Sequence, residues 1–252
     1  MLVYRRFKKL PQTKLVDGMI DLCSKSIDIH FSDAQDKSHT FLVGGFRTSL
    51  ENIKKIKYNF VNIDKGYLQP NTKNTVYWRM SYNAFQLNKL FDAPGDRLNV
   101  KIKKWNKQGS YIIILAPNPD PLNYYYNDTI SSWINKIKTQ LLLHTDRKIF
   151  VRYKDNKKIR AQDPIEKYFD NCYAVISLQS LGSISATIHG IPCINLAPSA
   201  LSLLHNMKLE NIENLEYPDN RYEWLKCLSY SQFTWKEMEN GYALNTLERY
   251  QI

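Results

Sequence analysis

Short apolar runs recur along the second half of the chain, and segments with helical spacing lie between them. The runs are "YIIILAP" from Tyr111, "KIFVRY" from Lys148, "YAVISL" from Tyr173 and "IPCINLA" from Ile191. Apolar runs without alternation are typical of strands that are covered on both faces of a parallel sheet. We therefore expect four strands here, buried in the middle of a domain.

The intervening segments have the pattern of helices. "SSWINKIKTQLLLH" carries an apolar stripe, and Ser131 or Ser132 is placed to cap its start. Residues 164–169 indicate a short helix, and "SISATIHG" indicates another, which Gly190 would close. The alternation of strand and helix predicts an α/β fold with a parallel, doubly wound sheet.

The first half of the chain alternates in a similar way. "TFLVGGF" from Thr40 and "YNFVNID" from Tyr58 indicate strands, with the helical segment "TSLENIKKIK" between them. The stretch "LNVKIKKWNKQG" from Leu98 is polar and basic and ends in glycine, which is typical of a linker. We expect an N-terminal lobe over residues 1–105. Residues 106–252 would form a C-terminal lobe whose last helices pack back on the first.

Small and polar residues follow the run "YAVISL". They are Gln179, Ser180, Gly182 and Ser183, and a helix begins after them. Ligands of parallel α/β sheets bind at the carboxyl ends of the strands, and hydroxyls with free N–H groups at a helix start suit a phosphate. The alternative is that Ser180 or Ser183 only caps the helix.

A longer pattern around this loop resembles a known family. S-x-x-x-x-S-A-x-x-H-G-I-P-C-I, from Ser180 to Ile194, resembles the C-terminal lobe of GT-B glycosyltransferases, where such a loop and helix hold the sugar nucleotide. Many of those enzymes have Glu-Ala in this helix. This chain has Ser185-Ala186, so no carboxylate contact to the donor is implied.

The run "KIFVRYK" is similar to the basic strand end that faces the diphosphate in that family. The resemblance implies a metal-independent enzyme without a bound cofactor and with a nucleotide sugar, such as a UDP-sugar, as co-substrate. The donor-binding residues that it implies are Arg152, Lys154, Ser180, Gly182 and Ser183.

Two stretches of the first half, "FVNIDKGYL" from Phe60 and "VYWRMSYNAFQ" from Val76, resemble phage-type glycosyltransferases. Members of that group are thought to glycosylate hydroxymethylated pyrimidines in DNA. The resemblance implies two Rossmann-like parallel-sheet lobes facing a cleft, hexosyl or pentosyl transfer, and duplex DNA as a partner. It also implies a cytoplasmic protein, in the host cytoplasm if it is viral. The acceptor-binding residues that we expect are Tyr77, Trp78, Arg79 and Tyr82.

A general base for the acceptor hydroxyl is expected at a strand end of the first lobe. Asp64 closes the run "NFVNID" and can take a proton there. The alternative is a carboxylate that only caps the turn that follows. Asp92 and Asp96 are the other candidates, but turn chemistry explains both.

The net charge of +11 favours a polyanionic partner, although a lysine-rich solubilising surface explains it equally well. The four cysteines form no CxxC pair, so the spacing predicts no metal site. No apolar run is long enough to span a bilayer, and we expect no membrane partner. Two alternatives remain: a GT-B enzyme that acts on a glycan or small molecule, and a non-catalytic α/β protein that binds nucleic acid. The sugar, the stereochemical outcome and the oligomeric state are left open.

Overall fold

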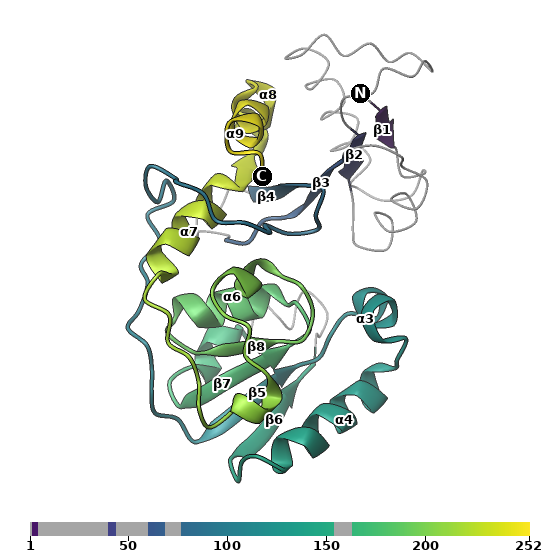
Figure 1. Ribbon diagram of the computed structural model, residues 1–252, viewed down its shortest axis with the longest axis vertical. Coiled ribbons are helices and arrows are strands. Elements are labelled where there is room, and N and C mark those ends of the chain that lie inside the picture. The colour runs from purple at the N-terminus through teal and green to yellow at the C-terminus, as the bar shows by residue number, and fades with distance from the viewer. Residues whose placement is uncertain (1, 5–39, 44–59, 69–76, 154–162) are drawn as a thin grey trace. The chain divides into compact units, whose positions relative to one another are not determined.

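The computed structural model describes residues 2–4, 40–43, 60–68, 77–153 and 163–252. The chain divides into two compact units, which are Met1–Asn99 with Leu225–Ile252, and Val100–Trp224. A different sheet forms the centre of each unit (Figure 1). The predicted helix over residues 48–57 lies outside the described residues.

The second unit is built on a four-stranded sheet with the order β6–β5–β7–β8, in which all neighbouring strands are parallel. Its strands are β5 (Tyr111–Leu115), β6 (Lys148–Arg152), β7 (Cys172–Ser177) and β8 (Cys193–Asn195). Its helices are α3 (Pro119–Tyr126), α4 (Ile130–Leu142), α6 (Leu181–Ile188) and the 3-10 helices η1 (Ile165–Tyr168), η2 (Ala200–Leu203) and η3 (Leu209–Asn211). The strands coincide with the four apolar runs, so the predicted α/β class and parallel sheet are confirmed.

Helices cover both faces of this sheet at β5 and β7, which explains why these strands are apolar without alternation. The expected burial does not hold for β6, which lies at the edge of the sheet and has no fully buried residue. Ile112 and Ile114 share a buried cluster with Trp133 of α4. Leu115 points to the opposite face, because successive side chains of a strand alternate. There it meets α6 so closely that a Cβ atom on Gly182 would lie 2.9 Å from the Leu115 Cδ1 atom. In Figure 1, α4 and α6 accordingly lie on opposite sides of the sheet.

The ends of the helices follow local signals, with one correction. The side chain of Thr129 caps α4 by accepting a hydrogen bond from the Ser132 N–H, so the predicted cap, Ser131 or Ser132, is wrong. The helix starts before these serines, because the extended backbone of Thr129 already supplies a hydroxyl there. Gly190 follows α6 with a φ of 84°, and a Cβ atom there would lie 2.0 Å from the Lys104 carbonyl oxygen. The predicted closure by glycine is therefore confirmed.

The expected linker belongs to the second unit. We expected a boundary after residue 105, whereas the division falls between Asn99 and Val100. The Lys103 N–H donates to the Ile188 carbonyl at 2.9 Å, and the Asn106 N–H donates to the Gly190 carbonyl at 2.7 Å. These backbone bonds join the segment to the end of α6, which is why it is part of that unit.

The first unit contains a five-stranded sheet with the order β1–β2–β3–β4–β9. Its strands are β1 (Leu2–Tyr4), β2 (Thr40–Val43), β3 (Phe60–Lys65), β4 (Tyr77–Tyr82) and β9 (Gln232–Thr234). Helix α7 (Arg221–Tyr230) leads the chain back into this unit, and α8 (Trp235–Glu239) and α9 (Tyr242–Tyr250) follow. The expectation of an all-parallel sheet needs correction here, because β4 is antiparallel to β3 and to β9.

One face of the first sheet is apolar and the other is polar. Ile63, Met80 and Phe233 lie on the apolar face and are at most 2% exposed. On the opposite face, Asn62 of β3 and Ser81 of β4 form a cross-strand pair and are equally buried. The period of two in "FVNID" produces this division, since it separates Val61 and Ile63 from their polar neighbours.

Candidate functional site

The carboxyl ends of β7 and β8 meet in a group of hydrogen-bonded polar side chains. Ser177 ends β7 and is paired in register with Asn195 of β8, and its hydroxyl donates to the Asn195 Oδ1 atom at 2.8 Å. The Asn195 amide donates to the Ser199 hydroxyl at 2.6 Å, and the Ser180 N–H donates to the Ser177 hydroxyl at 3.3 Å. The loops after the two strands are thus joined at the edge where parallel sheets bind ligands.

Ser180, Gly182 and Ser183 have different roles at the start of α6. Ser180 is the N-cap, and its hydroxyl accepts from the Gly182 N–H at 3.2 Å. Ser183 is fully buried, and its hydroxyl donates to the Ser180 carbonyl at 2.6 Å. Ser180 and Gly182 are partly exposed, so these two residues are the ones that a ligand can contact. Ser183 is buried and holds the loop in place through its hydrogen bond to the Ser180 carbonyl.

Arg152 lies at the carboxyl end of β6 and already holds a carboxylate. Its Nη1 atom lies 3.0 Å from the Asp163 Oδ2 atom, and the Tyr168 hydroxyl donates to the same carboxylate at 2.9 Å. The Tyr168 hydroxyl and Arg152 together lower the pKa of Asp163 below its usual value. Solvent screens partly exposed ion pairs of this kind, so an incoming phosphate can compete with Asp163. Lys154 lies outside the described residues.

Asp64 and Arg79, predicted separately as base and acceptor contact, form an ion pair. They are direct cross-strand neighbours on β3 and β4, and the Arg79 Nη2 atom donates to the Asp64 Oδ2 atom at 2.7 Å. The other carboxylate oxygen accepts from the Lys65 N–H at 2.7 Å. The Asp64 side chain remains 28% exposed and that of Arg79 only 9%. Asp64 is therefore open to a substrate, whereas Arg79 acts mainly on Asp64.

The loop after β3 is held on the polar face by a row of side chains that includes this pair. Gln232 is the neighbour of Arg79 on β9, and its amide bonds both the N–H and the carbonyl of Leu68, at 2.8 and 2.9 Å. The ring of Tyr67 lies 5.4 Å from the Arg79 guanidinium, and its hydroxyl accepts from the Leu87 N–H. Burial raises the pKa of Tyr67 to about 12. Much of the polar face is thus a scaffold for loops.

The four predicted acceptor contacts do not share one surface. All lie on β4, where side chains alternate between faces. Tyr77 and Arg79 are on the polar face, whereas Trp78 and Tyr82 are on the apolar face. Trp78 is paired with Phe233 of β9, which is fully buried. A single acceptor can therefore contact only one of these two pairs.

Two residues at the edge of the second sheet were not predicted as site residues. Asn195 connects the loops after β7 and β8, as described above. Gln179 stands just before the N-cap Ser180, and its Oε1 atom is buried without a hydrogen-bond partner. Gln179 directly follows the apolar run "YAVISL", and Asn195 is the one polar residue inside "IPCINLA", at the end of β8. These positions are the signals that could have identified them.

The described part of the chain offers neither a metal centre nor an activated thiol. No three His, Cys, Asp or Glu side chains come together in it to hold a metal ion. Cys172, Cys193 and Cys227 are buried, and burial raises the pKa of Cys172 to about 12. Such thiols are poor nucleophiles. None of the described helices is both long and apolar enough to cross a bilayer.

A groove of about 770 Å³ lies between α4 and the segment that follows β8. Leu196, Ala197 and Met207 give it apolar lining, and Gln140 of α4 adds an amide. Asn195 also lines it. The groove therefore borders the polar group at the carboxyl ends of β7 and β8.

No family model matches the sequence of this chain. No curated protein matches it either. Among solved structures, the beta Kdo 2,7 transferase KpsC of Thermosulfurimonas dismutans is similar to it, with a TM-score of 0.45 and 12% sequence identity. The superposition covers 96% of this chain and 91% of that one.

Proposed function

We propose that this chain is a glycosyltransferase that moves a sugar from a nucleotide-sugar donor to a hydroxyl group. The observation that carries the proposal lies at the carboxyl end of β7, where the partly exposed N-cap Ser180 and the start of α6 follow this buried strand. The Ser180 hydroxyl already accepts from the Gly182 N–H, and the Ser180 carbonyl accepts from the Ser183 N–H. The attraction for an anion therefore comes from the dipole at the start of the helix and from the Ser180 hydroxyl. The GT-B resemblance of residues 180–194 agrees with a diphosphate at this place.

In this proposal the leaving diphosphate is stabilised by the protein's own cations and dipoles. Arg152 would exchange Asp163 for a phosphate oxygen, because a guanidinium binds either anion with two parallel N–H groups. The start of α6 would face the same charge. Lys154, two residues after Arg152 in the sequence, is proposed as a second cation. The transfer would thus proceed without a metal ion.

Asp64 is proposed as the base that takes the proton of the acceptor hydroxyl. Its position at the carboxyl end of β3 and its partial exposure support this role. Each oxygen accepts one hydrogen bond from the protein and keeps capacity for a further one. Arg79 would hold the carboxylate in one orientation, which brings a general base into reach of its proton.

As the acceptor we propose a 5-hydroxymethylated pyrimidine in duplex DNA, supported by the net charge of +11 and by the likeness of residues 60–68 and 76–86 to phage-type enzymes. Exposed Lys101, Lys103 and Lys104 would meet phosphates. A glycan or small molecule is the second candidate. The division of Tyr77 and Arg79 from Trp78 and Tyr82 favours it, because a flipped base needs aromatic groups on one surface.

The test is incubation of the protein with a panel of sugar nucleotides and of acceptors, which include hydroxymethylated DNA and oligosaccharides. Nucleosides and glycans are then analysed by mass spectrometry. We expect a sugar on the modified nucleoside, and duplex binding that weakens steeply with salt. Sugar on a glycan alone would select the second acceptor class. Duplex binding without nucleotide binding or transfer would identify a non-catalytic nucleic-acid-binding protein.

A further inference from the structure

Tyr126 has an exposed side chain whose hydroxyl is bound to the protein. It is the last residue of α3 and is 45% exposed, yet its hydroxyl donates to the Leu196 carbonyl at 2.5 Å. A partly exposed tyrosine usually keeps its polar tip in water and buries its ring. Here the polar tip is bound to a backbone carbonyl, so the exposed side chain is held in one position at the surface.

The ring is held from both ends. Asn127 ends α3 with a φ of 47°, and its N–H donates to the Asn123 carbonyl at 2.9 Å. Thr129 then caps α4 directly, so the turn that carries Tyr126 has hydrogen-bonded ends. The hydroxyl bond to Leu196 restrains the other end of the side chain. A ring restrained in this way loses little conformational entropy when a ligand stacks on it.

The Tyr126 hydroxyl is bound at the carboxyl ends of the strands, where the Ser180 loop also begins. Leu196 comes directly after β8, and its N–H donates to the Ser177 carbonyl at 2.9 Å. The N–H of the next residue, Ala197, donates to the Leu178 carbonyl at 3.0 Å. Gln179 follows Leu178, and its Oε1 atom is the buried acceptor without a partner. The Tyr126 hydroxyl is thus bound to the segment after β8, and the unused Gln179 acceptor follows the neighbouring strand β7.

We propose that Tyr126 stacks on the base of a nucleotide and that the partly exposed Gln179 side chain turns outward, so that its Oε1 atom accepts a hydrogen bond from an N–H group of that base. The inference rests on the proposed function, because it locates the nucleoside part of the donor whose phosphates would lie at the start of α6. A nucleobase has a flat face that can stack on the Tyr126 ring and N–H donors that can bind the Gln179 Oε1 atom. Stacking of a base on an aromatic side chain contributes about 1–3 kcal/mol, which is about five- to 150-fold in affinity.

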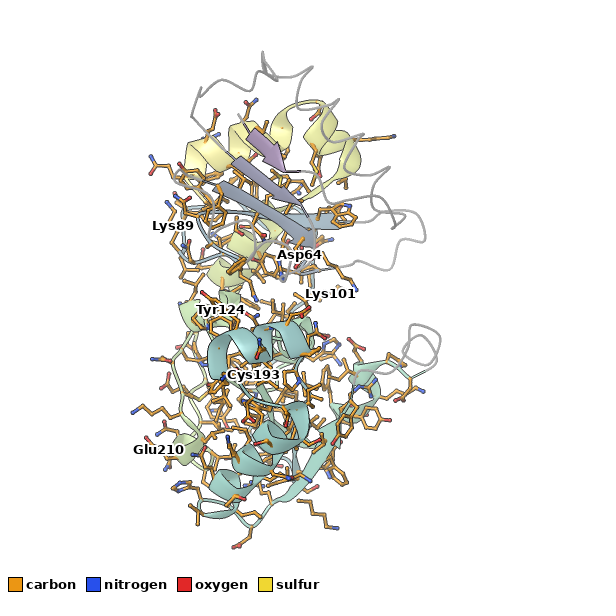
Figure 2. All side chains as sticks on the ribbon, turned by 90° about the vertical axis from the view of Figure 1, so that its right-hand side faces the viewer. Asp64, Lys89, Lys101, Tyr124, Cys193 and Glu210 are labelled. Atoms are coloured by element: carbon orange, nitrogen blue, oxygen red, sulfur yellow. The ribbon has the colours of Figure 1, made fainter. Side chains whose placement is uncertain are left out.

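Tyr124 provides a matched control on the same helix. It is 51% exposed, and its ring packs edge-on against Tyr125 at a centroid distance of 4.9 Å. Figure 2 labels Tyr124 on α3. Tyr124→Ala removes an exposed ring from α3 as Tyr126→Ala does, but it leaves the Leu196 contact intact. A general effect on α3 would therefore appear in both variants, and thermal unfolding of each variant checks that it is folded.

The experiment measures binding of UMP, CMP, AMP, GMP and ribose 5-phosphate to the full chain by titration calorimetry or NMR. We expect Tyr126→Ala to weaken binding of the best nucleotide by about five- to 150-fold and to leave ribose 5-phosphate unchanged, because only the base meets the ring. Tyr126→Phe should keep most of the affinity, since the ring remains. Gln179→Leu should weaken the nucleotide alone, and Tyr124→Ala should bind as the wild type does.

Several outcomes would overturn the inference. Nucleotide affinity that is unchanged in Tyr126→Ala would do so, and so would equal losses for the nucleotide and for ribose 5-phosphate. A wild-type chain that binds none of the nucleotides would overturn both this inference and the proposed function. Nucleotide binding that depends on Tyr126, in a protein that transfers no sugar, would support the inference and reject the proposed reaction alone.

Discussion

The two sheets of this chain carry their polar side chains in different places. In the second unit, β5 and β7 are buried on both faces, and hydrogen-bonding side chains gather where the strands end, at Ser177 and Asn195. In the first unit, polar residues alternate with apolar ones inside the strands, so one face holds Asn62, Arg79 and Ser81, each at most 7% exposed. The same kinds of side chain thus gather at the ends of the strands in the second unit and on one face of the sheet in the first.

This difference decides what a polar residue can do. At the strand ends of the second unit, Ser180 and Gly182 remain partly exposed, so the loop can meet a ligand. On the polar face of the first unit, Asn62 donates to the Phe85 carbonyl and Ser81 to the Ala84 carbonyl, which holds a loop in place. Buried polar groups that are satisfied in this way are mainly structural. Asp64 is the more exposed member of its pair with Arg79, and function on that face is expected at Asp64.

The largest effect is expected at Asp64. Asp64→Asn keeps the shape and one acceptor for Arg79 but removes the base, so turnover should fall by about two to four orders of magnitude. Donor affinity should stay near that of the wild type. Steady-state kinetics and calorimetry on the purified variant measure the two quantities, with the exposed Asp146→Asn as the control. A folded Asp64→Asn protein with full activity would move the base to Asp92 or Asp96.

The scaffold role of the polar face is tested next, at Gln232. Gln232→Leu leaves the N–H and the carbonyl of Leu68 without partners, and two such buried groups should lower the free energy of unfolding by about 2–5 kcal/mol. Chemical denaturation measures the loss. Gln140→Leu, which changes an exposed amide on α4, should cost less than about 0.5 kcal/mol. Similar losses in both variants would show that Gln232 does not hold the loop.

In the second unit, a buried histidine should make stability depend on pH. His205 is 9% exposed, its Nε2 atom has no partner, and burial lowers its pKa from 6.5 to about 4. His205 therefore binds a proton below pH 6.5 in the unfolded chain but only below about pH 4 in the folded chain. Stability is complete above pH 6.5 and falls below it, by about 2 kcal/mol between pH 8 and pH 5.

The variant His205→Gln does not titrate, so its loss of stability between pH 8 and pH 5 should be smaller by that amount. Unfolding curves at several pH values measure the difference, and the exposed His144→Gln serves as the control. Parallel pH profiles of wild type and His205→Gln would contradict the prediction.

The smallest effect is expected at the strand end of β6. Arg152→Ala should weaken binding of the nucleotide sugar about tenfold, or about 1.4 kcal/mol, because one charged hydrogen-bond donor is lost. The effect is limited because Arg152 must first leave Asp163. Calorimetric titration measures it, and Lys136→Ala, which breaks an exposed pair with Asp128, is the control. An unchanged affinity would show that Arg152 does not contact the donor. The Ser180 loop would then be the remaining candidate for donor binding in this part of the sheet.

The sequence by itself determined the features that depend on neighbouring residues. Strands β5 and β7 follow from runs that are apolar on both faces, and the division of β3 into two faces follows from the alternation in "FVNID". The cap at Ser180 and the closure at Gly190 follow from side-chain chemistry and from the backbone freedom of glycine at a positive φ. Each of these signals acts over a few residues and can be read without the rest of the fold.

Only the tertiary structure decided which distant residues meet. The antiparallel register of β3 and β4 places Arg79 opposite Asp64, and the return of the chain through α7 brings Gln232 beside Arg79. Helix α3 starts at a proline and was not predicted, and its contact with Leu196 joins groups that are 70 positions apart in the sequence. Strand register and helix docking are set by burial of whole faces. Short windows of sequence contain no information about partners on another strand, and this is the physical reason that the ion pair and the tethered tyrosine emerged only from the fold.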